Sequence, residues 1–312
     1  MRVVVALGGH ALLRKGQAMS IDTQRDNVRR ACGSLAPVAS EHELAVTHGN
    51  GPQVGLLALQ SVARSDVPPF SLDVLDAETQ GMIGYLIELE LGNCTGFEGQ
   101  VAALLTMVEV DLDDPAFADP TKPIGPAYDE ATADKLAGDL GWTFKARGDG
   151  YQRVVPSPEP RRILELRPIA SLLERGCTVI CGGGGGIPVV MGSHGRLDGV
   201  EAVVDKDCTS ALLATDLHAG FLVITTDVDA VYLQWGTPAA RAIRRARPDV
   251  LMEFTDHFEA GSMLPKVMAA CHFVTATGGV AAIGDLTDVT DILEQRAGTI
   301  ISLDAGDIEI DR

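Results

Sequence analysis

Apolar segments that end in glycine-rich turns recur along this chain. Four such pairs are "RVVVAL" (2–7) before "GGHALL", "ELAVTH" (43–48) before "GNGPQVG", "CTVIC" (177–181) before "GGGGG", and "HFVTAT" (272–277) before "GGVAAIG". Two further apolar runs lie at 101–108 and 221–226. Segments with helical periodicity separate most of these runs, at 22–39, 53–64, 77–91, 161–175 and 205–217. Apolar strands that alternate with helices predict an α/β fold whose mostly parallel sheet is covered on both faces.

The glycine turns predict a ligand crevice, because ligands of parallel α/β sheets bind at the carboxyl ends of the strands. Helix N-termini there present free N–H groups to anions, and glycine lets a ligand approach the backbone closely. A flexible linker would not recur in this pattern, although any single turn could be only a tight connection. We therefore predict one anion-binding crevice built from several strand ends.

The glycine turns match neither of two common nucleotide-binding motifs. The chain has no GxxxxGK[ST] sequence, which excludes a Walker A site. "GNGPQVG" (49–55) has three residues between its second and third glycines, where the dinucleotide fingerprint has two. Dinucleotide binding therefore remains only as a second interpretation.

The charge of the chain narrows the class of partner. The 312 residues carry a formal net charge of −18, with a pI near 4.7. Such a surface repels nucleic acid and anionic membranes, so an anionic substrate needs a local cluster of cations. The start "MRVVVALGG" is too short for a signal peptide, and no apolar run is long enough for a membrane span. We expect a cytoplasmic protein whose six cysteines are buried, reduced thiols. We expect no metal site at these cysteines, because the chain has no CxxC pair.

Only six of the 25 basic residues are lysines, so each lysine beside glycine or proline is a candidate for the cationic cluster. Lys122 lies in "PTKPIGP", within a proline-rich segment that breaks the alternation of strands and helices. We predict an inserted lid there, with Lys122 as a substrate clamp or, equally, as a solvated loop residue. The three remaining lysines outside glycine- or proline-rich motifs are predicted to be surface residues: Lys15, Lys135 and Lys145.

Lys206 and Lys266 are predicted at the starts of two helices. Lys206 lies between Asp205 and Asp207, which would keep its ammonium protonated and orient it. The alternative is an ordinary acidic helix start, but the helix dipole disfavours a lysine there. Lys266 follows Pro265 in the first turn of its helix, where a cation would suit phosphates.

The remaining candidate residues are of types that suit binding of a phosphoryl group rather than covalent catalysis. In "TTDVDAVYL" (225–233), Asp227 and Asp229 could meet the ribose, phosphates or metal of a nucleotide, and Tyr232 could flank its base. Turn or core roles are equally open for each of them. Neither His48 nor the Ser193–His194 pair forms a recognisable triad. Phosphoryl transfer needs positioning and cations more than a nucleophile, so it is the chemistry that these residues favour.

Taken in order, nine motifs resemble the carbamate kinase family of the amino acid kinase superfamily. They are "VVALGGHALL", "THGNGPQVG", "AETQGMIGY", "TKPIGPAY", "RVVPSPEP", "GGGGIPV", "VVDKDCTSALLA", "TDVDAVY" and "GSMLPKV". The resemblance implies a three-layer α/β/α open sandwich that forms homodimers. It implies residues 1–204 as the carbamate- and phosphoryl-binding lobe, with 111–156 as a protruding lid subdomain, and 205–312 as the nucleotide-binding lobe.

The resemblance also implies the reaction: ATP plus carbamate in exchange for ADP plus carbamoyl phosphate, with Mg²⁺ held by the nucleotide phosphates and not by protein ligands. The ATP-forming direction would end arginine, agmatine or purine-derived catabolism. Lys122 would reach the carbamate, while Lys206 and Lys266, the former oriented by Asp207, would neutralise the phosphoryl oxygens. The implied substrate and phosphoryl contacts are Gly8, Gly9, His10, Gly49, Asn50, Gly51, Gly183 and Gly184. The implied nucleotide contacts are Asp227, Val228, Tyr232 and Lys266.

Three positions depart from the family pattern: His10 replaces the usual Asn of the first loop, Ala127 replaces an aromatic residue, and Gly182 replaces a small residue such as Ser. His10 offers one donor on a bulkier ring whose charge changes near neutral pH. Two alternatives therefore stay open. One is a kinase of another small carboxylate, and the other is a catalytically weak metabolite-binding regulator.

Overall fold

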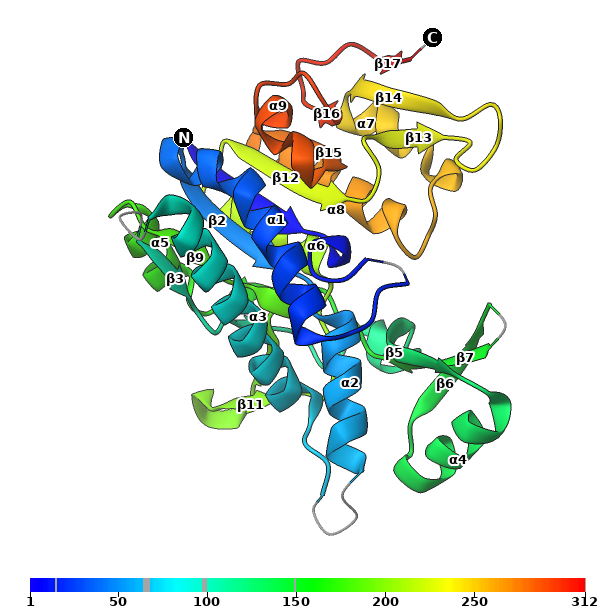
Figure 1. Ribbon diagram of the computed structural model, residues 1–312. Coiled ribbons are helices and arrows are strands. Elements are labelled where there is room, and N and C mark those ends of the chain that lie inside the picture. Colours follow the sequence, from blue (N-terminus) through cyan, green and yellow to red (C-terminus); the bar gives the residue numbers. More distant parts are fainter. Residues whose placement is uncertain (15, 64–67, 97–99, 149, 312) are drawn as a thin grey trace.

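The computed structural model describes residues 1–14, 16–63, 68–96, 100–148 and 150–311. Lys15 lies outside these residues. The largest sheet of the described chain has ten strands, in the order β13-β14-β16-β15-β12-β1-β2-β9-β3, with β17 paired to β14 (Figure 1). These strands are β1 (Arg2–Leu7), β2 (Glu43–His48), β3 (Val101–Ala103), β9 (Thr178–Ile180), β12 (Phe221–Thr226), β13 (Val231–Leu233), β14 (Arg241–Ala246), β15 (Val280–Asp285), β16 (Thr299–Ile301) and β17 (Ile308–Ile310).

Two smaller sheets and nine helices complete the described part of the chain. One sheet joins β11 (Leu197–Gly199), β10 (Ile187–Met191), β4 (Met107–Glu109) and β8 (Arg162–Ile163), and the other joins β5 (Lys122–Tyr128), β7 (Gly150–Val155) and β6 (Thr143–Arg147). The α-helices are α1 (Ile21–Glu41), α2 (Gly51–Val62), α3 (Leu72–Thr95), α4 (Glu130–Leu140), α5 (Leu166–Leu173), α6 (Lys206–Asp216), α7 (Pro248–Met252), α8 (Met263–Thr277) and α9 (Val289–Leu293). Six short 3₁₀ turns include η1 (Gly9–Ala11) and η3 (Gly183–Gly185).

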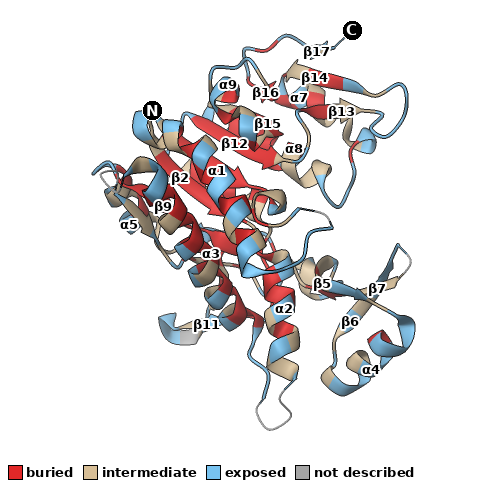
Figure 2. Ribbon diagram, in the orientation of Figure 1, coloured by how far each residue is buried: buried red, intermediate tan, exposed pale blue. Residues whose placement is uncertain are grey.

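The alternation of side chains along β1 explains why the molecule has three layers. Val3 and Val5 pack into one apolar cluster with residues of α1, α3 and α9, whereas Val4 and Ala6 pack into another with residues of α5, α6 and α8. Successive side chains of a strand point to opposite faces, so each face buries its own cluster. Figure 2 shows the buried residues along the central strands and on the helix faces turned toward them.

The central strands of the large sheet are parallel, as predicted. β1 pairs in parallel with β2 and β12, and β12 pairs in parallel with β15. The antiparallel pairs lie toward the β13 edge. Because β1 and β12 are neighbours, the sheet continues across residue 205, where we predicted the boundary between two lobes. The carboxyl ends of these strands therefore lie at one edge of the sheet.

A subdomain of β5, β6, β7 and α4 projects from the sandwich beside α2 (Figure 1). It lies within the predicted lid segment 111–156. Its base packs closely on α2, because a Cβ atom at Gly55 would lie 2.1 Å from the Cα of Gly125. Gly125 has a φ of +70°, a conformation that favours glycine. Two glycines thus set the contact between lid and sandwich.

The predicted strand 272–277 is wrong, because these residues form the last turns of α8. Phe273 and Val274 are buried together with Val267, Ala270 and Cys271, and this spacing is helical. The β-branched residues between His272 and Gly278 suggested a strand, but burial on one helix face decided the conformation. The adjoining "GGVAAIG" is not a turn after a strand: Gly278 ends the helix, and Val280–Asp285 is the strand β15.

The predicted strand 101–108 is two strands in different sheets. β3 pairs with β9, and β4 pairs with β10. Between them, the backbone N–H of Thr106 donates to Gln80 Oε1 at 2.8 Å rather than to a neighbouring strand. The predicted helix 161–175 is likewise shorter, because it begins with the strand β8 and only Leu166–Leu173 is helical.

Two further findings concern the whole described chain. None of its helices has both the length and the apolarity that crossing a bilayer requires. All six cysteines fall within the described residues and are free thiols; Cys94 is exposed and Cys208 half-buried, whereas we predicted buried thiols throughout.

Candidate active site

A cavity of about 820 Å³ opens at the carboxyl ends of β1, β2 and β12. It is lined by fourteen of the fifteen residues predicted to contact substrate, phosphoryl group or nucleotide: Gly8, Gly9, His10, Gly49, Asn50, Gly51, Lys122, Gly184, Lys206, Asp207, Asp227, Val228, Tyr232 and Lys266. Gly183 is not among the described residues that line it. The cavity thus brings together segments from both halves of the chain and from the lid.

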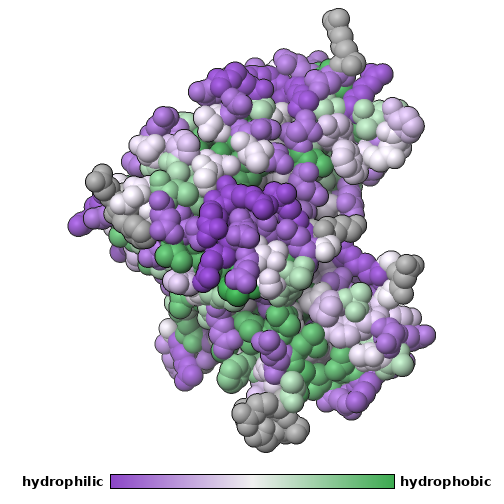
Figure 3. Space-filling view, viewed as in Figure 1, coloured by the Kyte–Doolittle hydropathy of each residue, from purple (hydrophilic) through white to green (hydrophobic). Residues whose placement is uncertain are grey.

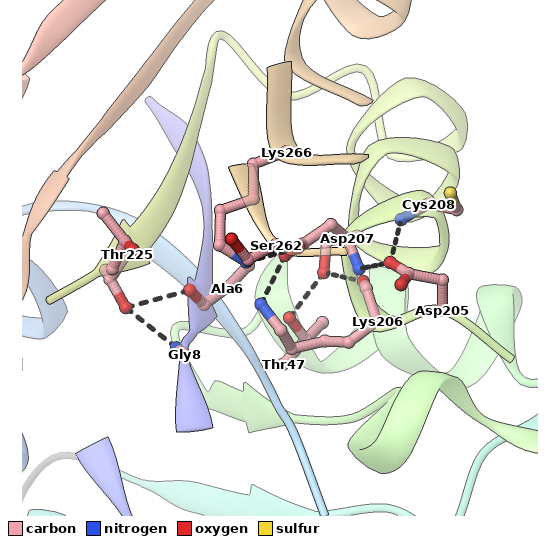
Figure 4. A network of polar contacts seen from close by, with 12 residues as sticks. Ala6, Gly8, Thr47, Asp205, Lys206, Asp207, Cys208, Thr225, Ser262 and Lys266 are labelled. Carbon is pink, nitrogen blue, oxygen red and sulfur yellow. Dashed lines mark hydrogen bonds and ion pairs between the residues drawn. The ribbon is translucent and has the colours of Figure 1, made fainter. Parts of the chain in front are cut away.

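The turn after β1 packs tightly against the end of β12. The N–H of Gly8 donates to Thr225 Oγ1 at 2.9 Å, and Thr225 Oγ1 donates to the carbonyl of Ala6 at 3.1 Å (Figure 4). A Cβ atom at Gly8 would lie 2.6 Å from the carbonyl oxygen of Thr225. Glycine is therefore required at position 8, because any larger residue would collide with the backbone of Thr225. The turn that follows, with Gly9 and His10, lines the cavity.

The glycine run at 182–186 serves packing more than ligand contact, which corrects our interpretation of it as a ligand-facing loop. A Cβ atom at Gly183 would lie 2.4 Å from the ring of His48, and one at Gly185 would lie 2.1 Å from the Val204 carbonyl. Four of the five glycines have positive φ values, and the run leads into β10 rather than into a helix. Only Gly184 lines the cavity.

Asp207 links two lysines at the cavity wall. Its Oδ1 lies 2.5 Å from Lys206 Nζ, and its Oδ2 lies 2.7 Å from Lys266 Nζ (Figure 4). The three side chains are only 6%, 11% and 16% exposed, in the order Asp207, Lys206, Lys266. Lys206 and Asp207 begin α6, and Lys266 lies in the first turns of α8. Two helix N-termini therefore bring the two ammonium groups to one carboxylate.

Burial and charge act in opposite directions within this cluster. Burial opposes ionisation of Asp207, but the two lysines outweigh it and hold the pKa of the carboxyl well below its usual range. Burial also lowers the pKa of Lys206, and the attraction of Asp207 offsets this only in part. For Lys266 the carboxylate outweighs burial, so its pKa is raised. Asp207 is thus the anion that holds two buried cations side by side.

Asp205 has a different role from the one predicted. We expected it to hold Lys206, but its carboxylate forms an ion pair with Lys122 instead. The other carboxylate oxygen caps α6 by accepting a hydrogen bond from the N–H of Asp207 at 2.8 Å, which satisfies a free helix donor. Lys122 lies at the start of β5, so this ion pair joins the lid to the sandwich across the cavity.

His10 contacts the opposite side of the cavity mouth. Its Nε2 lies 3.1 Å from Asp227 Oδ2, and the side chains of His10 and Asp227 are 43% and 58% exposed. His10 belongs to η1 and Asp227 follows β12. The residue that departs from the family pattern thus contacts a predicted nucleotide residue.

An aromatic pair marks the end of the cavity near β13. The rings of Tyr232 and Trp235 lie 5.0 Å apart, and the Tyr232 hydroxyl donates to Asp229 Oδ1 at 2.6 Å. Trp235 lines the cavity although it is 60% exposed. Trp235 was not among the predicted residues, although a tryptophan three residues after Tyr232 was an available signal. The segment from Asp256 to Met263, several residues of which line the cavity beside Lys266, was not predicted either.

The described residues favour transfer of an anionic group without a covalent protein intermediate. No group of three or more His, Cys, Asp or Glu side chains within the described part of the chain could hold a metal ion. Burial lowers the pKa of His48 to about 4, so this histidine is uncharged at neutral pH. Glycine turns and three lysines line one cavity, where the carboxylates of Asp205 and Asp207 hold the three ammonium groups in place. This is the arrangement that phosphoryl transfer requires.

Comparison with known proteins agrees with this geometry. The model of the amino acid kinase family matches residues 1–284. A carbamate kinase of Rhizobium meliloti is 55% identical over 310 residues, which cover 99% of this chain and 95% of that protein. A carbamate kinase of Haemophilus influenzae is 54% identical over 302 residues, which cover 97% of each chain.

A solved structure extends the agreement to the fold. The carbamate kinase of Giardia lamblia bound to AMP-PNP has a TM-score of 0.88 and 38% sequence identity, over 96% of this chain and 98% of that chain. The resemblance in the sequence and the predicted α/β/α fold class are thereby confirmed. The chain belongs to the amino acid kinase family and, within it, to the carbamate kinases.

Proposed function

We propose that this protein is an ATP-dependent phosphotransferase that interconverts ATP plus carbamate and ADP plus carbamoyl phosphate, and that it serves ATP formation. The observation that carries this proposal is the pair of buried lysines on Asp207, at the wall of a cavity lined by glycine turns. A carbamoyl phosphate anion needs such cations where charge builds up on the transferred group.

Lys206 and Lys266 would neutralise the oxygens of the phosphoryl group during transfer, and Asp207 would hold them in place. The backbone N–H groups near Gly9, Gly49 and Gly51 would surround that group, since unpaired amides at turns and helix starts bind phosphate oxygens. Gly8, whose own N–H donates to Thr225 Oγ1, would hold the turn in place beside it. This arrangement holds the reactants in line without a covalent step. Gly183 supports the site from behind the cavity wall, where it packs on His48.

The nucleotide would occupy the side formed by Asp227, Val228 and Tyr232, together with Lys266. The exposed ring of Trp235 offers an apolar surface beside Tyr232 for a base. Mg²⁺ would enter with the nucleotide, held by its phosphates, because Asp207 is already paired with two lysines. Residues 205–312 would thus form the nucleotide-binding lobe, and residues 1–204 would bind carbamate and the phosphoryl group.

Lys122 would contact the carbamate end from the lid, residues 111–156. Its ion pair with Asp205 supports this proposal, because it places the ammonium at the cavity wall beside Lys206. Substrate would exchange this ion pair for a contact with its own negative charge. The lid would then exclude water from the transferring group, as closing segments do in other enzymes.

The test is ATP formation from ADP, Mg²⁺ and carbamoyl phosphate, coupled to hexokinase and glucose-6-phosphate dehydrogenase. We expect rapid ATP formation that depends on the protein. No ATP from folded protein that binds ADP would refute carbamate as the acceptor, and a screen of other acyl phosphates would then test the alternative kinase.

We further propose that the protein is a homodimer. Figure 3 shows apolar side chains gathered over α2 and α3, where Leu56, Val74 and Tyr85 are exposed. Exposed apolar patches of this kind often mark protein interfaces. Light scattering of purified protein tests this: twice the chain mass of 32.9 kDa is expected, and a monomer at micromolar concentration would contradict it.

A further inference from the structure

Asp76 is a buried carboxyl group that the proposed reaction does not use. It lies on α3 and is fully buried. Its Oδ1 accepts a hydrogen bond from Asn50 Nδ2 at 2.7 Å, whereas its Oδ2 is buried without a hydrogen-bond partner among the described residues. Burial raises the pKa of this carboxyl well above its usual range. Among the described residues, the hydrogen bond that this carboxyl group forms is thus the one with Asn50.

Thr79 decides which way the amide of Asn50 is turned. Its hydroxyl donates to the carbonyl oxygen of Asp76 at 2.9 Å, so its single proton is already used. Toward Asn50, 2.8 Å away, Thr79 Oγ1 can only accept. The amide atom that faces Thr79 must then be the nitrogen. Asp76 Oδ1 and Thr79 Oγ1 together take up both N–H groups of this amide.

The orientation of Asn50 leaves its carbonyl oxygen for the cavity. Asn50 lines the cavity between Gly49 and Gly51, and its amide packs closely on Gly184, where a Cβ atom would lie 2.3 Å from Nδ2. Because Nδ2 is held on the side of Asp76, Oδ1 is the polar atom that a ligand can meet. An oxygen acceptor favours a ligand that offers an N–H group over one that offers a methyl group.

We propose that Asp76 is a positioning residue for substrate selection: with Thr79 it fixes the amide of Asn50, so that Asn50 Oδ1 accepts a hydrogen bond from the amino group of the carbamoyl substrate. Acetyl phosphate, with a methyl group at that place, leaves the same oxygen without a partner. The inference rests on the proposed function and adds the group that distinguishes a carbamoyl from an acyl phosphate.

The test compares the wild type with Asp76→Leu, which is similar in size but cannot accept a hydrogen bond. In the ATP-forming assay, kcat/KM is measured for carbamoyl phosphate, and acetyl phosphate is titrated as a competing ligand to obtain its inhibition constant. We expect kcat/KM for carbamoyl phosphate to fall about tenfold, the worth of one hydrogen bond. The inhibition constant of acetyl phosphate should stay within about twofold, because that ligand makes no bond to Asn50 Oδ1.

Two further variants separate positioning from folding. Asp76→Asn is neutral and nearly isosteric, keeps an acceptor for Asn50 Nδ2, and should restore the wild-type preference. Thr79→Val removes the second acceptor without changing the size of the side chain, and it should weaken the preference even if Asp76→Leu does not fold.

Each outcome distinguishes this inference from the proposed function. A wild type that forms ATP from carbamoyl phosphate, with variants that lose affinity for both ligands equally or for neither, would overturn the role of Asp76 and leave the function standing. A folded wild type that forms no ATP from carbamoyl phosphate would overturn both.

Discussion

Replacing Asp207 by Asn should destabilise the protein strongly while keeping the shape of the side chain. The carboxylate is 6% exposed and pairs with two lysines that are each less than 20% exposed. An asparagine amide carries no charge, so two buried ammonium groups would lose the carboxylate with which both of them pair. Breaking a buried ion pair from one side costs about 3–5 kcal/mol. We expect the free energy of unfolding at neutral pH to fall by about this amount.

The contribution of Asp207 to stability depends on pH, and the shift of its pKa gives the direction of this dependence. The pKa of Asp207 is lower in the folded protein than in the unfolded chain. Its contribution to stability is therefore present at pH values above its ordinary pKa of about 4 and is lost as the pH falls through the folded value. The difference in stability between wild type and Asp207→Asn should be full at neutral pH and should shrink in acid.

Urea unfolding followed by circular dichroism measures this difference through the transition midpoint at an unchanged slope. Asp119→Asn is the matched control, because its partner Lys145 lies at a similar 2.7 Å but the pair is exposed. This control should change stability by less than about 1 kcal/mol. A change in Asp207→Asn no larger than that of the control would refute the account of the buried cluster.

Three further predictions concern activity. Lys206→Ala and Lys266→Ala should each lower turnover at least ~100-fold, since each removes a cation from the transferring group; near-normal turnover in either would remove that lysine from the mechanism. Lys122→Ala should raise the KM for carbamoyl phosphate more than it weakens ADP binding measured by calorimetry, and an equal loss of both would contradict the clamp role. His10→Asn should keep activity in the coupled assay if His10 replaces the family's Asn as a phosphate donor, whereas a large loss would make His10 a specialised residue.

Local patterns were sufficient to predict the central parallel strands of the sheet and fourteen of the residues that line the cavity. The apolar runs at 2–7, 43–48 and 221–226 form adjacent parallel strands, and the turns that follow them reach the cavity. The run at 272–277 could not be assigned correctly, because β-branched residues suit either a strand or a buried helix face. Only the packing of Phe273 against the sheet decided between them.

The sequence did not predict which side chains, far apart along the chain, form ion pairs and hydrogen bonds with one another. Asp205 and Asp207 flank Lys206 symmetrically, yet Asp207 binds Lys206 and Lys266, whereas Asp205 binds Lys122, which is 83 residues away. The role of Asp76 was hidden for the same reason, since its partner Asn50 belongs to another helix start. The chemistry of the side chains identifies the candidate residues of a site, but the topology of the chain determines which of these residues contact one another.

The most direct test of the central claim is ATP formation by the wild type and by the Lys206→Ala, Lys266→Ala double variant, with ADP, Mg²⁺ and carbamoyl phosphate at equal concentrations. Circular dichroism and ADP binding would establish that both proteins are folded. We predict rapid ATP formation by the wild type and at least ~100-fold slower formation by the double variant. Equal rates would contradict the claim that these two lysines carry phosphoryl transfer, and no ATP from the folded wild type would contradict the proposed reaction itself.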